Sequence, residues 1–137
     1  VPVIFFSPDG KEPFTPGIDS TTIAQQIDIM PTILEFVGYE NTFVAFGKSL
    51  ISTAPQESYA VNFTNEVYQY YKWEYVLLFD GEKSIALYNI RKDPLLKNNI
   101  LADTDVKEIM ERELKAIIQQ YMTRMVNNRL TAETDNK

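Results

Sequence analysis

Two aspartates, Asp28 and Asp93, are the residues whose type and position could most readily do chemistry. Asp28 precedes a short apolar segment, where its carboxylate could act as a metal ligand or as an acid–base group. Asp93 precedes Pro94 and could begin a calcium loop, although such a loop needs several oxygen ligands at regular spacing. We favour a structural interpretation of both. A carboxylate in the first turn of a helix interacts with the helix dipole, and Asp-Pro is typical of a turn.

Lys48 and Ser49 follow Gly47 and so resemble part of a phosphate-binding loop. The preceding glycine that this loop requires is missing, and Ala45 and Phe46 supply neither its spacing nor its chemistry. We therefore discard a nucleotide-binding function.

Aromatic residues gather in the middle of the chain and could stack on a sugar or on a lipid headgroup. They are Tyr68, Tyr70, Tyr71, Trp73 and Tyr75. Strand alternation places Tyr68 and Tyr70 on the face opposite Tyr71, so the rings cannot all share one surface. The alternative function is thus a non-catalytic glycan- or lipid-headgroup-binding module. Its mark would be an exposed, coplanar set of Tyr70, Trp73 and Tyr75, whereas burial of these rings would favour a structural role.

The composition lacks the residue types that most often act as general bases and metal ligands. The 137 residues include no histidine and no cysteine, so the usual general base and the commonest metal ligands are missing. A net charge of −6 disfavours nucleic acid as a partner. We predict no catalytic residue, no cofactor-binding residue and no metal ligand in this chain.

Residues 1–52 are predicted to form the end of an α/β catalytic domain. The apolar run from Val3 to Phe6 predicts one strand of a larger sheet, covered on both faces. Apolar residues spaced by three or four predict a helix over 25–37, with Pro31 tolerated in its first turn and Gly38 ending it.

Residues 53–137 are predicted to form an antiparallel sheet with an amphipathic helix. Alternating segments predict four strands between 58 and 88, with Tyr59, Val61 and Phe63 on one face. Helical spacing predicts a long helix over 105–128 that lies across this sheet. Its acidic residues Glu108, Glu111 and Glu113 are expected on a solvated face. The fold class is therefore α/β overall, and α+β within this chain.

Two segments carry a resemblance to a known family. Asp28-Ile29-Met30-Pro31-Thr32-Ile33-Leu34, followed by Gly38, is similar to a helix found late in the sulfatase branch of the alkaline phosphatase superfamily. A second segment, from Leu87 to Ile100, is similar to the C-terminal signature of the same branch, with Leu87, Tyr88, Asp93, Pro94 and Asn99 matching. Leu96 stands where the family usually has glutamate. The segment Phe46 to Leu50 leans toward the lipoteichoic-acid-synthase-like phosphoglycerol transferases.

The resemblance implies that this chain is the C-terminal portion of a metal-dependent sulfuric ester hydrolase or phosphoglycerol transferase. It further implies that the nucleophile and the residues that hold a divalent metal ion lie upstream, in a missing N-terminal catalytic portion of the same chain. We expect the parent protein to be an enzyme of the cell envelope, periplasmic or membrane-anchored. This chain alone is expected to be inactive, and in isolation it could form a dimer.

Overall fold

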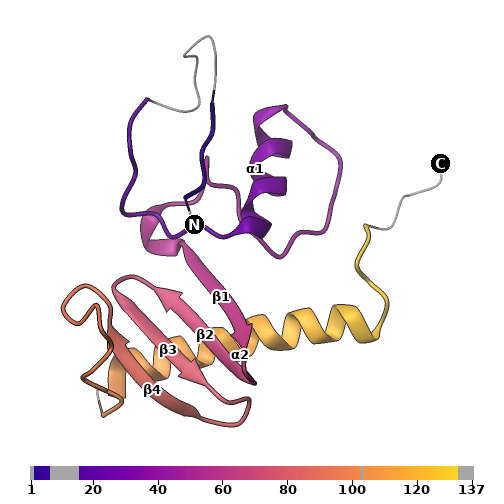
Figure 1. The fold of residues 1–137 in the computed structure, drawn as a ribbon. Coiled ribbons are helices and arrows are strands. Elements are labelled where there is room, and N and C mark those ends of the chain that lie inside the picture. The colour runs from indigo at the N-terminus through magenta and orange to yellow at the C-terminus, as the bar shows by residue number, and fades with distance from the viewer. Residues whose placement is uncertain (1, 7–15, 103, 133–137) are drawn as a thin grey trace.

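The computed structural model describes residues 2–6, 16–102 and 104–132. The fold is α+β: a four-stranded antiparallel sheet, a long C-terminal helix beneath it and a smaller helix–loop unit beside it (Figure 1). The helix–loop unit contains a 3₁₀ turn η1 (Gln26–Asp28), helix α1 (Ile29–Phe36) and a second 3₁₀ turn η2 (Pro55–Glu57). This arrangement confirms the predicted sheet, short helix and long helix.

The sheet is a simple meander of β1 (Tyr59–Thr64), β2 (Val67–Lys72), β3 (Tyr75–Phe79) and β4 (Ser84–Asn89), in that spatial order. Asn65 and Glu66 both have positive φ angles, of 50° and 63°. Two such residues in a two-residue hairpin suit the twist of the strands that they connect. The β2–β3 turn places Trp73 at φ 54°.

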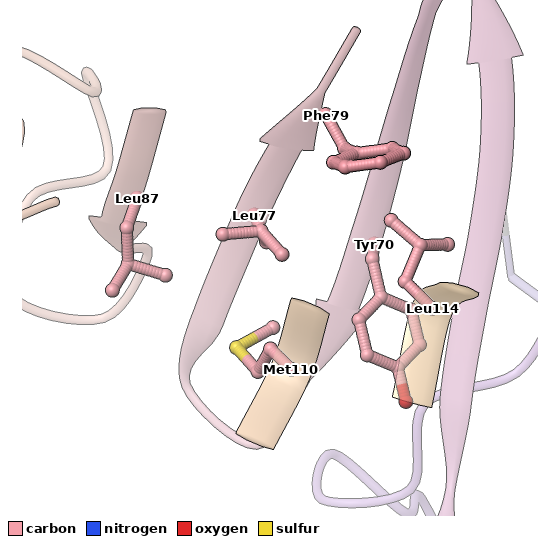
Figure 2. Close-up of a cluster of buried hydrophobic side chains, with 6 residues drawn as sticks. All are labelled: Tyr70, Leu77, Phe79, Leu87, Met110 and Leu114. Carbon is pink, nitrogen blue, oxygen red and sulfur yellow. The ribbon is translucent and has the colours of Figure 1, made fainter. Parts of the chain in front are cut away.

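Helix α2 (Thr104–Val126) closes one face of the sheet. Figure 2 shows the core between them, to which the sheet contributes Tyr70, Leu77, Phe79 and Leu87, and the helix contributes Met110 and Leu114. Tyr59 and Val61 pack against this cluster, as the alternation in β1 predicts. Met110 is fully buried, whereas Met122 and Met125, farther along α2, are nearly half exposed.

The structure differs from the prediction at Val3–Phe6. Residues 2–6 form no strand, and the side chains of Ile4 and Phe6 are 82% and 86% exposed. A strand buried on both faces needs a covering layer on each face, and the side chains of Ile4 and Phe6 lack such a layer among the described residues. That these residues belong to a larger sheet stays a prediction.

Candidate functional site

The carboxylate of Asp28 links the start of α1 to a loop twenty residues away. Asp28 is 3% exposed. Its Oδ2 accepts a hydrogen bond from Gln25 N–H at 2.9 Å, and its Oδ1 accepts one from Lys48 N–H at 2.8 Å. The first bond closes the opening turn of the helix, as a first-turn carboxylate should. The second bond to a backbone donor of a distant loop has no counterpart in the sequence-based prediction.

Thr32, one helical turn after Asp28, holds the same loop at a second point. Its hydroxyl donates to the carbonyl oxygen of Asp28 at 2.5 Å and accepts from Leu50 N–H at 3.0 Å. The Thr32 side chain is fully buried. A buried hydroxyl that both donates and accepts leaves neither the helix nor the loop with an unsatisfied polar group.

Gly47 lies against the backbone of the turn that precedes α1. A Cβ at this position would lie 2.2 Å from the carbonyl oxygen of Ile27 and 2.7 Å from the amide nitrogen of Asp28. Only glycine permits this approach. We call Asp28, Thr32, Gly47, Lys48 and Leu50 the helix–loop clamp.

The clamp decides between the two interpretations of Asp28. Both of its carboxylate oxygens accept backbone hydrogen bonds and almost none of its surface is exposed, so it is placed to hold the fold rather than to bind a substrate. Among the described residues, no three His, Cys, Asp or Glu side chains gather in a way that could hold a metal ion.

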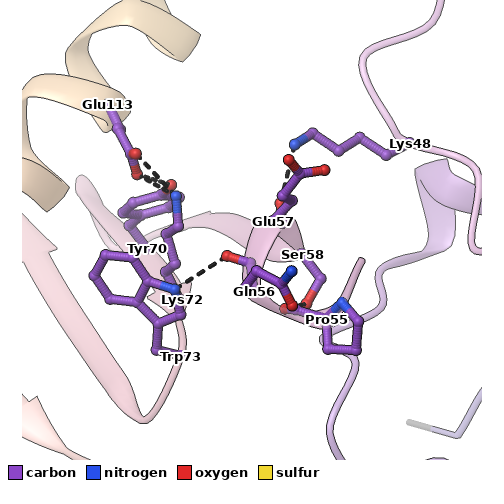
Figure 3. Close-up of polar contacts among 9 residues, drawn as sticks. All are labelled: Lys48, Pro55, Gln56, Glu57, Ser58, Tyr70, Lys72, Trp73 and Glu113. Atoms are coloured by element: carbon purple, nitrogen blue, oxygen red, sulfur yellow. Dashed lines mark hydrogen bonds and ion pairs between the residues drawn. The ribbon is translucent and has the colours of Figure 1, made fainter. Parts of the chain in front are cut away.

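The connection between the two halves is held from both sides (Figure 3). Lys48 Nζ donates to the carbonyl oxygen of Glu57 at 2.9 Å and lies 4.7 Å from the ring centre of Tyr59. Trp73 Nε1 donates to the carbonyl oxygen of Gln56 at 3.0 Å. The contacts of Lys48 join the predicted regions 1–52 and 53–137, whereas the Trp73–Gln56 bond lies within the second region. The boundary between the regions stays a prediction.

A charged cluster lies where α2 meets β2. Glu113 pairs with Lys72 at 2.7 Å and accepts a hydrogen bond from the Tyr70 hydroxyl at 2.9 Å (Figure 3). Burial, followed by the hydrogen bond to Glu113, raises the pKa of Tyr70. Burial is also the main cause that raises the pKa of Tyr59, whose ring lies beside that of Tyr70. Glu113 is therefore turned toward the sheet, which corrects its expected place on a solvated face.

The aromatic residues do not form the exposed platform that the binding-module hypothesis needs. Tyr70 is 1% exposed and lies between the sheet and α2, with Tyr68 on the same side. Trp73 is 37% exposed, but its indole is held by Gln56 and lies under Lys72 Nζ, 4.9 Å from the ring centre. Tyr71 bonds to Gln69 on the opposite face. The arrangement favours the structural role.

The second signature segment also builds structure. Asp93 Oδ2 accepts a hydrogen bond from Asn98 N–H at 2.6 Å, which supports the turn interpretation of Asp93-Pro94. Asn99 covers the free edge of β4: its Oδ1 accepts from Leu87 N–H at 3.1 Å, and the next amide, that of Ile100, donates to the carbonyl oxygen of Leu87 at 2.8 Å. The free edge of β1, on the other side of the sheet, is also covered by a side chain: Gln25 Oε1 accepts a hydrogen bond from Val61 N–H at 3.1 Å.

The described helices include none that is long and apolar enough to cross a membrane.

Comparison with known proteins assigns no family. No protein-family model matches the chain, and no curated protein matches it. A solved structure that it resembles is that of BT4656 in complex with its substrate, D-glucosamine-2-N,6-O-disulfate, with a TM-score of 0.44 and 18% sequence identity. The likeness covers 77% of this chain and 25% of BT4656, so this chain spans about a quarter of that protein's length. Similarity of this degree assigns neither an activity nor a substrate.

Proposed function

We propose that this chain is the C-terminal structural part of a metal-dependent enzyme of the sulfatase family, either a sulfuric ester hydrolase or a phosphoglycerol transferase. In this proposal it completes the fold of the enzyme and forms one wall of the substrate cleft. The nucleophile and the ligands of the divalent metal ion belong to an upstream portion of the same polypeptide, which is its partner. The parent enzyme is proposed to work in the cell envelope.

One observation carries the proposal: the polar residues of both signature segments bond within the chain. In the first segment Asp28 and Thr32 bond to the loop at 48–50, and in the second Asp93 and Asn99 bond to backbone amides. Residues that build the fold are what a non-catalytic part of an enzyme would retain. The sequence resemblance supports the proposed family, and the hydrogen bonds support the proposed structural role.

The gene provides the first test. The codons upstream of Val1 are expected to encode an Asp-His pair close by and, earlier, a Thr, Ser or Cys nucleophile. An open reading frame that encodes this domain alone, without such residues, would overturn the proposal.

The activity provides the second test. The isolated chain and the longer chain are assayed with an aryl sulfate and a phosphodiester, each with added Mg²⁺, Mn²⁺, Zn²⁺ or Ca²⁺ and with a chelator. We expect metal-dependent turnover from the longer chain only. Chelator-sensitive turnover by the isolated chain would contradict the proposed division of labour.

A variant of the longer chain separates a structural from a catalytic role. Thr32→Val keeps the shape of the side chain and removes its hydroxyl. We expect a lower unfolding midpoint with an unchanged kcat for each folded molecule. A drop in kcat at unchanged stability would place Thr32 in the chemistry.

A further inference from the structure

Trp73 adopts a backbone conformation that its residue type disfavours. It lies in the two-residue turn between β2 and β3 and has a φ of 54°. Positive φ angles in turns are usual for glycine, asparagine and aspartate, whereas a bulky side chain crowds its own backbone there. A costly conformation of this kind persists where other contacts hold it, and it marks a position with a role beyond the turn itself.

The contacts of the indole show what that role is. Trp73 Nε1 donates to the carbonyl oxygen of Gln56 in η2 at 3.0 Å (Figure 3). Lys72 Nζ lies 4.9 Å from the ring centre and pairs with Glu113 of α2 at 2.7 Å. The indole is thus held by the sheet and α2, and it bonds to the helix–loop unit.

The boundary between the sheet and the helix–loop unit lies outside the hydrophobic core. Among the described residues, the core cluster and the side chains packed against it come from the sheet, α2 and the segment between β4 and α2. Across the boundary, Ile23 N–H donates to Ser58 Oγ at 2.9 Å, and Val61 N–H donates to Gln25 Oε1 at 3.1 Å. Two units that share no buried core are free to move relative to each other unless specific contacts hold them.

The 3₁₀ turn η2 connects the two units along the chain. Its own hydrogen bonds are donated by Glu57 N–H and Ser58 N–H and span three residues each. Hydrogen-bond geometry in a 3₁₀ turn is poorer than in an α-helix, so contacts from outside decide how firmly it is held. Lys48 holds the carbonyl oxygen of Glu57 from the helix–loop unit, and Trp73 holds that of Gln56 from the sheet.

We propose that Trp73 is a latch that fixes the helix–loop unit against the sheet through η2. When the indole is bonded to Gln56, the two units form one body. When that bond breaks, η2 opens and the hydrogen bonds across the boundary break with it, while the clamp and the sheet keep their own. This inference concerns the chain taken by itself and is independent of the proposed function.

Native-state hydrogen exchange followed by NMR tests the latch in the variant Trp73→Phe. Phenylalanine keeps an aromatic ring beside Lys72 and removes the indole donor. We expect four amide protons to exchange about 3- to 10-fold faster by a common factor, because one hydrogen bond fewer opposes the opening that exposes them. They are those of Ile23, Glu57, Ser58 and Val61. The Lys48 and Leu50 amides, which bond within the clamp, should keep their wild-type rates.

Tyr71→Phe is the matched control. It also removes the donor of an aromatic side chain, but the Tyr71 hydroxyl bonds to Gln69 within the sheet, at 3.3 Å. All four rates should stay within about twofold of wild type. Trp73→Leu, which also lacks a donor, is the second variant if Trp73→Phe folds poorly, and wild-type rates for the amides of β3 confirm that a variant is folded.

Unchanged rates at Glu57 and Ser58 in Trp73→Phe would overturn the proposal. Faster exchange there without a matching change at Ile23 and Val61 would also overturn it, because the indole would then hold η2 alone and not the two units. A uniform rise that includes the clamp and the sheet would show a loss of global stability and would exclude a latch. None of these results bears on the proposed function, which the upstream sequence and the activity assays test separately.

Discussion

Replacing Gly47 with alanine would push apart the two segments that the helix–loop clamp holds together. The new Cβ would lie 2.2 Å from the carbonyl oxygen of Ile27, and Cβ contacts shorter than 3.0 Å are essentially never seen. Both partners are backbone, so no side-chain rotation relieves the contact. The loop must retreat by about 1 Å, and the 2.8 Å bond from Lys48 N–H to Asp28 then exceeds hydrogen-bonding distance.

The magnitude follows from three contributions. Losing a hydrogen bond to a charged acceptor costs about 1.5–3 kcal/mol, and inserting a methyl group into a packed site costs about 1–3 kcal/mol. Alanine restricts the unfolded chain, which offsets about 0.4–1 kcal/mol. We expect a net destabilisation of about 2–4 kcal/mol, which corresponds to a 30- to 1,000-fold faster exchange of the Lys48 amide proton.

Native-state hydrogen exchange followed by NMR measures this change residue by residue. Gly38→Ala is the matched control, since Gly38 has a φ of +68° with no atom within 4 Å of an added Cβ. Its cost is only that of a left-handed alanine, about 1 kcal/mol. If the Lys48 amide of the Gly47→Ala protein exchanged within about threefold of the wild-type rate, the steric account of the clamp would be wrong.

Three further outcomes follow from the sheet and its helix. Asn99→Ala should lower the free energy of unfolding by about 1–2 kcal/mol in urea titrations, because Leu87 N–H loses its acceptor; an unchanged midpoint would refute the edge-covering role. Glu113→Gln should cost about 1–3 kcal/mol, since Lys72 is only 12% exposed and loses its carboxylate, while the partial exposure of Glu113 limits the loss; adding Lys72→Met should restore part of it. The raised pKa of Tyr70 favours its protonated form in the folded state, so its contribution to stability is complete below the ordinary value of 10.0 and is lost as the pH rises above that value. Unfolding midpoints between pH 8 and 12 should fall less steeply in Tyr70→Phe, and equal slopes would contradict this.

The sequence predicted the sheet and the long helix closely because both have one buried face. Alternation at Tyr59 and Val61 and helical spacing through Met110 and Leu114 are direct results of that burial. Phe63, which the same alternation placed with Tyr59 and Val61, is 61% exposed. Val3–Phe6 forms no strand in the structure, and its place in a larger sheet stays a prediction. An apolar run predicts burial, but the layers that would cover it come from outside the run and cannot be read from it.

The clamp could be anticipated only in part. The position of Asp28 at a helix start follows from its neighbours, but its second donor is the backbone amide of Lys48. Every non-proline residue has a backbone amide, so the residue type at position 48 does not indicate that this amide bonds to Asp28. Glu113 was misplaced because its partner Lys72 lies 41 residues away on a strand, and local charge patterning reports only on neighbours within the helix.

The length of α2 has a consequence for how the chain tolerates insertions and deletions. Its first half packs beneath the sheet (Figure 1). Tyr121, in its second half, contacts Phe46 of the helix–loop unit, with 4.8 Å between the ring centres. The helix therefore sets both the distance and the rotation between the two units, at about 1.5 Å and 100° per residue. Removing one residue between Ile118 and Tyr121 would swing the tyrosine off its partner while leaving the helix residues that pack against the sheet core in place. The spacing of this helix should consequently be less tolerant of length change than its individual side chains are of substitution.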